Sequence, residues 1–139
     1  MLVVTKEGTV CIARQWQDSA APGPFLRLYK NNVMPDHTFT IASFLENTFL
    51  GYAAQPMGAP TLISGQPDGS CLLVWPTLTF SASVPSTEQS FGYFVVDIDP
   101  VLLTPVLVWC EAKTPVVSWI TPGQSLSIQP QLNLSTLFG

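Results

Sequence analysis

Hydrophobic and polar residues alternate along two stretches of the chain with the period of a β-strand. Between positions 78 and 84 the even positions hold Leu, Phe, Ala and Val, while the odd positions from 77 to 83 hold only Thr and Ser. The stretch from Ser125 to Phe138 repeats this pattern with Leu, Ile and Phe against Ser, Gln and Asn. Each predicts a strand with one buried and one solvent face. Because Pro130 interrupts the second stretch, we expect two strands there, or one edge strand with a break.

Two further stretches, Phe91–Ile98 and Val106–Cys110, are apolar at nearly every position. A strand of a two-layer sandwich normally buries only one face. The pattern therefore indicates central strands whose outer side is covered by another element or by another subunit. A shorter stretch, Phe25–Tyr29, is apolar except for Arg27 and predicts the first strand of the main domain.

Prolines and glycines divide the chain into short segments. There are 13 prolines and nine glycines, and from Pro56 onward the prolines follow one another at intervals of 4 to 15 residues. Long helices do not tolerate such spacing, whereas short strands joined by turns do. With 139 residues, enough for one ordinary domain, we expect an all-β fold: a single β-sandwich of jelly-roll type over residues 25–139.

Residues 1–24 differ in character from the rest, and we expect an N-terminal arm or short helix there. Thr5 is placed to cap a helix that runs to about Gln17, although Gly8 weakens that prediction. The segment Ala20–Pro24 is a linker, because two prolines and a glycine resist regular structure. Within the main domain, Ser43–Thr48 has the capping-box spacing of one helical turn.

Charged residues make up only 10% of the chain, against about 25% in a typical domain. This shortage favours a surface that is partly covered by a permanent protein interface, although uncharged polar residues can also coat a surface. The net charge of −4 argues against nucleic acid as a partner. Four of the five basic residues, including Arg14, Arg27 and Lys30, fall in the first 30 positions. This asymmetry either orients the chain on a partner or reflects chance among few charges.

The three cysteines do not form a disulfide framework or a zinc motif, because they are odd in number and widely spaced. Cys71 and Cys110 lie in apolar stretches, where a thiol behaves as a small buried hydrophobe. This favours synthesis in a reducing compartment. A signal peptide is not expected, because no basic region precedes the opening apolar residues. A membrane span is not expected either, since the longest apolar run is short and broken.

Candidate catalytic groups are sparse. His37 is the one histidine, and with Asp36 it is better explained as a solvated turn than as part of a triad. Asp97 and Asp99 would share one strand face, but they stand before a proline, where acids commonly begin a turn. We therefore expect a protein that is not an enzyme and needs neither a metal nor another cofactor.

The four tryptophans leave two functions open. Trp75 and Trp109 lie in dense apolar strands, which favours the core. Trp16 and Trp119 are expected at the surface as anchors for a protein partner. Exposed aromatics on a β-sandwich also stack on sugars, so a carbohydrate-binding module is an alternative.

Several motifs occur in an order that resembles a group of small tailed-bacteriophage virion proteins. The segment Leu26–Asn32 is similar to an LxLYxN strand of that group, and Phe44–Ala53 to its following FxExxFxGYA segment. After a variable middle, Phe91–Asp97 is similar to the GYxVxD strand and Leu107–Glu111 to the strand after it. The resemblance extends from Phe25 to Phe138 and contains no catalytic motif.

The resemblance implies a structural component of the virion. Within that group the chain is most similar to capsid cement (decoration) proteins, such as the jelly-roll cement protein of Bordetella phage, and a tail or baseplate component is the alternative. A cement protein would bind the outside of the assembled lattice of major capsid protein, and a homodimer is expected. The candidate partner-binding residues are Arg14, Trp16, Arg27, Lys30, Phe94, Val96 and Trp119.

Overall fold

The computed structural model describes residues 2–4, 24–63, 72–99 and 101–133, and these residues are almost entirely β-strand and loop. Their elements, in chain order, are β1 (Leu2–Val4), β2 (Phe25–Tyr29), the 3-10 helix η1 (Ile41–Ser43), β3 (Gln55–Pro56), β4 (Thr61–Ile63), β5 (Leu72–Val74), β6 (Leu78–Ser81), β7 (Gln89–Ile98), β8 (Pro105–Ser118), β9 (Ser125–Ile128) and β10 (Gln131–Asn133). The prediction of an all-β fold is confirmed.

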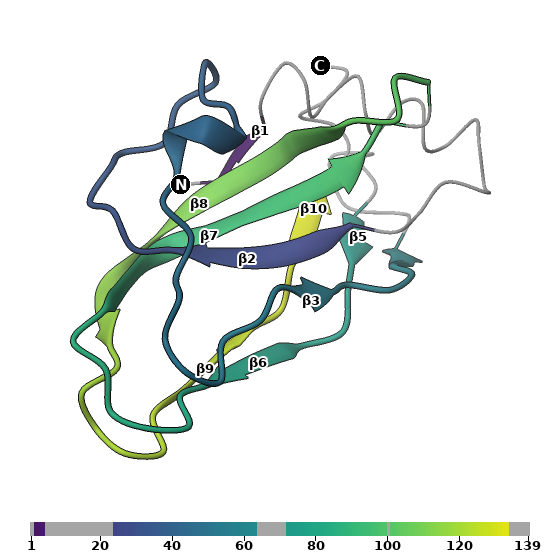
Figure 1. The fold of residues 1–139 in the computed structure, drawn as a ribbon. Helices are drawn as coiled ribbons and strands as arrows, with labels where there is room; N and C mark the ends of the chain where they lie inside the picture. The colour runs from purple at the N-terminus through teal and green to yellow at the C-terminus, as the bar shows by residue number, and fades with distance from the viewer. Residues whose placement is uncertain (1, 5–23, 64–71, 100, 134–139) are drawn as a thin grey trace.

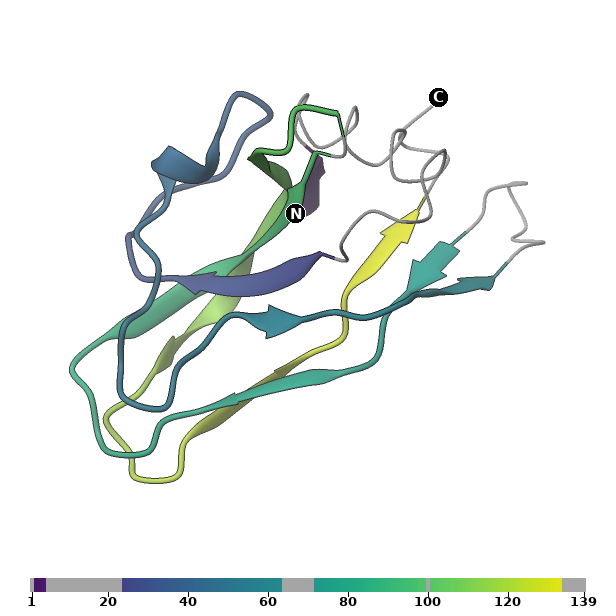
Figure 2. The same ribbon diagram turned by 45° about the vertical axis from the view of Figure 1, so that its right-hand side comes forward.

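The larger layer is a five-stranded antiparallel sheet with the order β1-β8-β7-β2-β3 (Figure 1). Its centre is the hairpin of β7 and β8, whose pairing runs from Gln89 opposite Ser118 to Ile98 opposite Pro105. The predicted strands Phe25–Tyr29 and Phe91–Ile98 are confirmed as β2 and as most of β7. The β7–β8 hairpin runs the length of the molecule and joins its two ends (Figures 1 and 2).

The second layer is made of two short antiparallel sheets, β10-β5-β4 and β6-β9. They follow one another along the same two chain segments, because β5 leads into β6 and β9 leads into β10 (Figure 2). Pro76 and Pro130 lie at the two breaks, where the Trp75 amide donates a hydrogen bond to the Pro130 carbonyl at 3.0 Å. The expected interruption at Pro130 is confirmed, since a proline cannot donate to a strand ladder.

The main hydrophobic core fills the space between the two layers. The even residues of β6 and β9 point inward, with Phe80, Leu126 and Ile128 buried, while Ser81, Ser125 and Ser127 are exposed. The predicted alternation is therefore confirmed up to the end of β6. Other core residues come from both layers, including Leu26, Leu28, Phe49, Met57, Leu73, Trp75, Val95, Val108, Trp109, Trp119 and Leu132.

The outer face of the larger sheet is covered by a loop of the same chain. Phe44 stacks on Phe94 with ring centroids 4.8 Å apart and also contacts Tyr29 at 4.7 Å. Val96, Leu107 and Cys110 complete this second cluster, which Val33, Phe39, Ile41 and Phe91 flank. Of the two explanations for strands apolar on both faces, cover by another element of this chain is correct. This outer face therefore gives no reason to infer a subunit interface there.

The predicted helical turn at Ser43–Thr48 is wrong in position. The 3-10 helix lies two residues earlier, at Ile41–Ser43, with Thr40 as its N-cap. The following residues are extended along the edge of β2, where Lys30 donates to the Leu45 carbonyl at 2.7 Å and Asn47 donates to the Leu28 carbonyl at 3.0 Å. Burial of Phe44 on the sheet favours this extended conformation over a helical turn.

The N-terminal segment that we expect to be an arm begins with a short strand. Leu2, Val3 and Val4 form β1 and pair with Glu111, Cys110 and Trp109 of β8. The larger sheet therefore includes the first residues of the segment that we expected to be an arm. The predicted helix from Thr5 to Gln17 lies outside the described residues.

Candidate functional site

The turn between β7 and β8, which we call the hairpin tip (residues 101–103), is built by Asp99. Its Oδ1 atom accepts hydrogen bonds from the amides of Val101 at 2.9 Å and Leu102 at 3.1 Å. Its backbone carbonyl accepts from the Leu103 amide at 2.8 Å. The expectation that this acid begins a turn is confirmed. Leu103 has a positive φ of 58°, a conformation that a residue with a side chain adopts at some cost.

Three aliphatic side chains project from this tip. Val101 is 68% exposed, Leu102 62% and Leu103 76%. The sequence from position 100 to position 108 contains no charged residue. Since the Asp99 hydrogen bonds fix the backbone, the tip presents an apolar surface that is already ordered before any partner arrives.

Three loops meet at the opposite end of the β7–β8 hairpin (Figure 1). The amide of Ser83 donates to the Leu50 carbonyl at 2.8 Å, which joins the loop after Asn47 to the loop after β6. The amide of Ser86 donates to the Trp119 carbonyl at 2.8 Å, which joins the loop after β6 to the loop after β8. Backbone hydrogen bonds therefore make the three loops one continuous surface.

This surface is also apolar, and we call it the uncharged end (residues 48–54, 82–87 and 119–124). Leu50 is 65% exposed, Ile120 64% and Val84 47%. Its three segments contain no Asp, Glu, Lys or Arg. Exposed aliphatic residues grouped at both ends of a sandwich are unusual for a surface that faces only water, and they are typical of protein contact sites.

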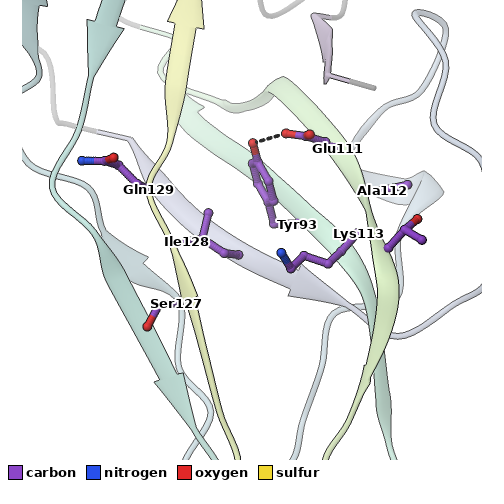
Figure 3. A pocket seen from close by; sticks show the side chains of 8 residues that line it. Tyr93, Glu111, Ala112, Lys113, Ser127, Ile128 and Gln129 are labelled. Atoms are coloured by element: carbon purple, nitrogen blue, oxygen red, sulfur yellow. Dashed lines mark hydrogen bonds between the residues drawn. The ribbon is translucent and has the colours of Figure 1, made fainter.

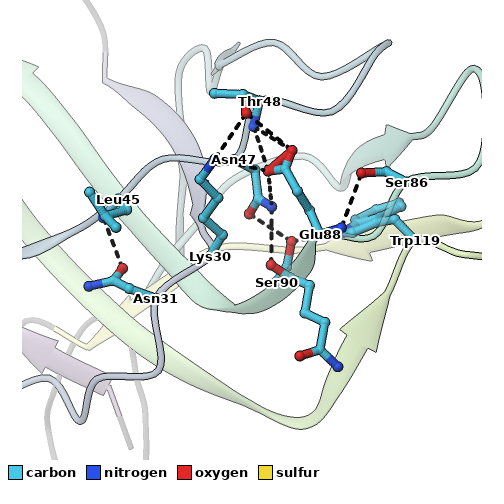
Figure 4. A network of polar contacts seen from close by, with 10 residues as sticks. Lys30, Asn31, Leu45, Asn47, Thr48, Ser86, Glu88, Ser90 and Trp119 are labelled. Atoms are coloured by element: carbon cyan, nitrogen blue, oxygen red, sulfur yellow. Dashed lines mark hydrogen bonds and ion pairs between the residues drawn. The ribbon is translucent and has the colours of Figure 1, made fainter.

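A buried polar network lies beside the uncharged end (Figure 4). The indole Nε1 of Trp119 donates to Ser90 Oγ at 2.8 Å, and the Ser90 hydroxyl donates to Asn47 Oδ1 at 2.8 Å. The Asn47 amide in turn donates to the Gln89 carbonyl at 3.1 Å and to Glu88 Oε1 at 3.3 Å. Trp119, Ser90 and Asn47 are each at most 1% exposed, so these bonds replace those that water would supply.

At the surface the network ends on Glu88 and Lys30. Glu88 accepts hydrogen bonds from the amide of Thr48 at 2.9 Å and from its hydroxyl at 3.1 Å. Lys30 Nζ lies 3.0 Å from Thr48 Oγ1 and 3.5 Å from Glu88 Oε1. Partial burial raises the pKa of Glu88, but the hydrogen bonds from Thr48 and the charge of Lys30 outweigh it and lower the pKa overall.

Arg27 is also held within the chain. Its Nη1 atom forms an ion pair with Glu46 Oε2 at 2.9 Å. The other oxygen of Glu46 accepts from the Tyr52 hydroxyl at 2.7 Å, and that hydroxyl accepts from the Leu28 amide at 3.0 Å. Tyr52 thereby satisfies a backbone donor of β2, and burial followed by the bond to Glu46 raises its pKa. These contacts attach the loop that contains Glu46 and Tyr52 to β2.

A polar cavity of about 440 Å³ opens between β8 and β9 (Figure 3). Tyr93 donates to Glu111 Oε2 at 2.7 Å at its inner side, and Lys113, Ser127 and Gln129 also line it. Burial and the neighbouring Glu111 raise the pKa of Tyr93, so its phenol stays protonated and serves as a donor. The cavity is suited to water or to a small polar solute, and it holds no nucleophile paired with a base among its lining residues.

The remaining candidate residues named from the sequence either form a turn or are buried. Asp36 Oδ1 accepts from the Thr38 amide at 2.7 Å beside an exposed His37, which confirms the turn. Burial raises the pKa of Asp97 to about 6 and the pKa of the Cys110 thiol to about 12.

Within the described residues, His, Cys, Asp and Glu do not gather in a group of three that could hold a metal. None of the helices in the same part of the chain has the length and the hydropathy that crossing a membrane requires.

The structure places the candidate partner-binding residues in different surroundings. Trp119 is fully buried, so its expected place at the surface is wrong, whereas Trp75 and Trp109 are confirmed as core residues. Phe94 and Val96 lie under the chain's own loop and are at most 5% exposed. Arg27 and Lys30 reach the surface but make internal ion pairs. Arg14 and Trp16 lie outside the described residues. The exposed residues of the two ends were not predicted.

Comparison with known proteins gives no relative from which a role could be inferred. No protein-family model, no curated protein and no solved structure matches the chain.

Proposed function

We propose that the chain is a non-enzymatic structural protein of a tailed-bacteriophage virion, a cement protein that binds the outside of the assembled shell. Its partner is the lattice of major capsid protein, and its action is passive. A protein that binds the assembled lattice but not the free subunits stabilises the lattice by mass action. Many copies together then oppose the outward pressure of packaged DNA.

The observation that carries this proposal is the position of the exposed aliphatic residues. They gather at the hairpin tip and at the uncharged end, on rigid backbone. The polar groups beside them are satisfied within the chain, as in the bonds from Trp119 to Ser90 and from Ser90 to Asn47. Such a molecule is built to contact other proteins at its ends. The sequence motifs that resemble virion proteins indicate which proteins these are.

We also propose that the two-layer fold is a jelly roll, as the resemblance implies. The continuity of β5 with β6 and of β9 with β10 supports a layer of long, bent strands. An experimental structure that includes residues 64–71 and 134–139 tests this topology, and an up-and-down strand order would contradict it.

The carbohydrate-binding alternative loses the support of three of the four tryptophans, and the fourth, Trp16, lies outside the described residues. Trp75, Trp109 and Trp119 are at most 6% exposed, and none offers a face to a sugar. A tail or baseplate location remains the competing structural role, because the same apolar ends would serve it.

Shell binding can be tested by adding the purified chain to shells assembled without it. We expect the chain to sediment with the shells and to raise the temperature at which they disassemble. Binding to purified tails but not to shells would contradict the cement role and favour the tail.

The N-terminal candidates require substitution, because deleting residues 1–24 would also remove β1 from the larger sheet. If Arg14 and Trp16 contact the shell, Arg14→Ala together with Trp16→Ala should weaken sedimentation while the melting temperature of the chain stays unchanged. Lys113→Ala is a matched control that removes a basic residue elsewhere. Equal binding by all three proteins would exclude the two residues from the contact.

A further inference from the structure

The two apolar ends lie at opposite ends of one rigid element. β7 is ten residues long, which corresponds to roughly 30 Å at the usual rise of a strand. The hairpin tip follows its last residue, and the uncharged end lies around its first residue (Figures 1 and 2). Two copies stacked along this direction would bring the tip of one against the uncharged end of the other.

We infer that the hairpin tip of one copy docks on the uncharged end of the next copy, so that the protein associates head to tail. This inference deepens the proposed function, on which it rests for its setting, by naming a second copy of this chain as the partner of both ends. The contact is heterologous, since the two surfaces differ, and it produces rings or open rows and not a closed dimer.

The chemistry of the two ends supports this partner. Neither end contains a charged residue, so burying one against the other leaves no unpaired charge in the contact. A single contact between copies covers two apolar surfaces at once, whereas a foreign partner would cover only one. The absence of Lys and Arg from both segments also disfavours an anionic membrane surface as the occupant.

The two surfaces differ in width. The tip is a narrow turn that carries three adjacent aliphatic side chains, and the uncharged end is a broader surface formed by three loops. Leu103 keeps a large, 76% exposed side chain at a φ of 58°, where Gly or Asn would be less strained. Contact with a neighbouring copy would explain why an apolar residue occupies this position.

The contact involves few side chains and is small compared with a stable interface of about 1,200–2,000 Å². We therefore expect weak self-association in solution, visible at high protein concentration. On a shell surface, neighbouring bound copies are held close together, and their high effective concentration strengthens the same contact. Head-to-tail rows would link neighbouring binding sites on the lattice.

Two double variants test the direction of the contact. The tip variant carries Leu102→Asn and Leu103→Asn, and Asn is suited to the left-handed conformation at position 103. The end variant carries Leu50→Asn and Ile120→Asn. Met34→Asn is the control, because Met34 is 79% exposed but belongs to neither end. Circular dichroism and thermal melting confirm that each variant is folded before it is used.

Sedimentation equilibrium over a range of concentrations then gives the association constants. We expect the wild type and the Met34→Asn control to associate, and each double variant alone to associate at least about tenfold more weakly. A mixture of the two double variants retains one intact tip and one intact uncharged end. It should therefore form a 1:1 heterodimer that does not grow further.

Other outcomes would overturn the inference. A wild type that stays monomeric at all concentrations excludes self-association. Unchanged association of the end variant alone would show tip-to-tip contact, and unchanged association of the tip variant alone would show contact between two uncharged ends. These failures concern the chain in solution and are distinguishable from failure to bind shells, which concerns the proposed function.

Discussion

Trp119 donates its indole hydrogen to Ser90 at 2.8 Å, inside a region where both side chains are almost completely buried. The two residues are 29 positions apart and lie at the same end of the β7–β8 hairpin. The Ser90 hydroxyl in turn donates a hydrogen bond to Asn47, which lies in the loop after β2. This pair therefore fixes the backbone beneath the uncharged end and keeps its exposed residues in place.

Replacing Ser90 by Ala should destabilise the protein by about 1–3 kcal/mol, because it leaves a buried indole donor and a buried amide oxygen with one partner fewer. The free energy of unfolding in urea measures the loss. Ser125→Ala is a matched control, since Ser125 is an exposed residue of β9. If both variants unfold at the same urea concentration, the network does not contribute to stability.

Asp97 should make the protein less stable at neutral pH than at mildly acidic pH. Burial raises its pKa from 3.8 to about 6, so the folded protein disfavours the ionised carboxylate. This contribution to stability is complete below about pH 4 and is lost as the pH rises through 6. Asp97→Asn keeps an oxygen for the Ile98 amide, and it should stabilise the protein at pH 7 by roughly 1–3 kcal/mol.

The measurement is the difference in unfolding free energy between Asp97→Asn and wild type from pH 4 to pH 7. Comparing the two proteins cancels the opposite contribution of Glu88, whose pKa is lowered. The difference should grow with pH. A difference that is constant across the range would contradict the assignment.

Gly92 is required where β7 passes closely between β8 and a tyrosine. A Cβ atom at this position would meet the Glu111 carbonyl and the Tyr29 ring, with the Tyr29 Cε1 atom only 2.7 Å away. Gly92→Ala should therefore cost about 3 kcal/mol or more. Gly123→Ala serves for comparison, because it has open space and only a positive φ of 76°, worth about 1–2 kcal/mol. Thermal melting ranks the two, and a larger loss for Gly123→Ala would refute the explanation.

Replacing Leu103 by Gly should stabilise the isolated protein while weakening its self-association. Glycine adopts the left-handed conformation at position 103 without the penalty that a side chain carries, about 1 kcal/mol. The melting temperature and the association constant are measured on the same sample. A variant that is less stable than wild type, or that associates equally well, would show that the strain at Leu103 is unrelated to docking.

The regular part of the fold could be predicted from local patterns. The alternation in β6 and β9 and the break at Pro130 depend only on neighbouring residues, and all three are confirmed. The C-terminal half of β8 could not be predicted in the same way. Its residues 111–118 include charged residues and Pro115, and such a composition is more typical of a loop than of a strand. The register shift between Ser90 and Gly92 leaves residues 113–116, which include Pro115, without paired partners on β7, so that a proline is tolerated there.

The residues of the candidate sites depended on long-range contacts. Trp119 follows the end of a strand and is next to Ile120, so nothing local distinguishes the buried residue from the exposed one. Its partners Ser90 and Asn47 come from distant segments. One local signal was available for the hairpin tip: three aliphatic residues between Pro100 and Thr104, directly after an acid that favours turns. A turn that is apolar is a better indicator of a contact surface than an apolar strand.

The copy number of this chain in purified virions is the most direct test of the cement role. If the chain belongs to a tailed phage, as proposed, quantitative mass spectrometry measures its copy number against that of the major capsid protein. We expect a number comparable to that of the shell subunit, because a cement protein occupies the whole lattice. A handful of copies would place the chain in the tail, and its absence from the particle would contradict a structural role in the virion.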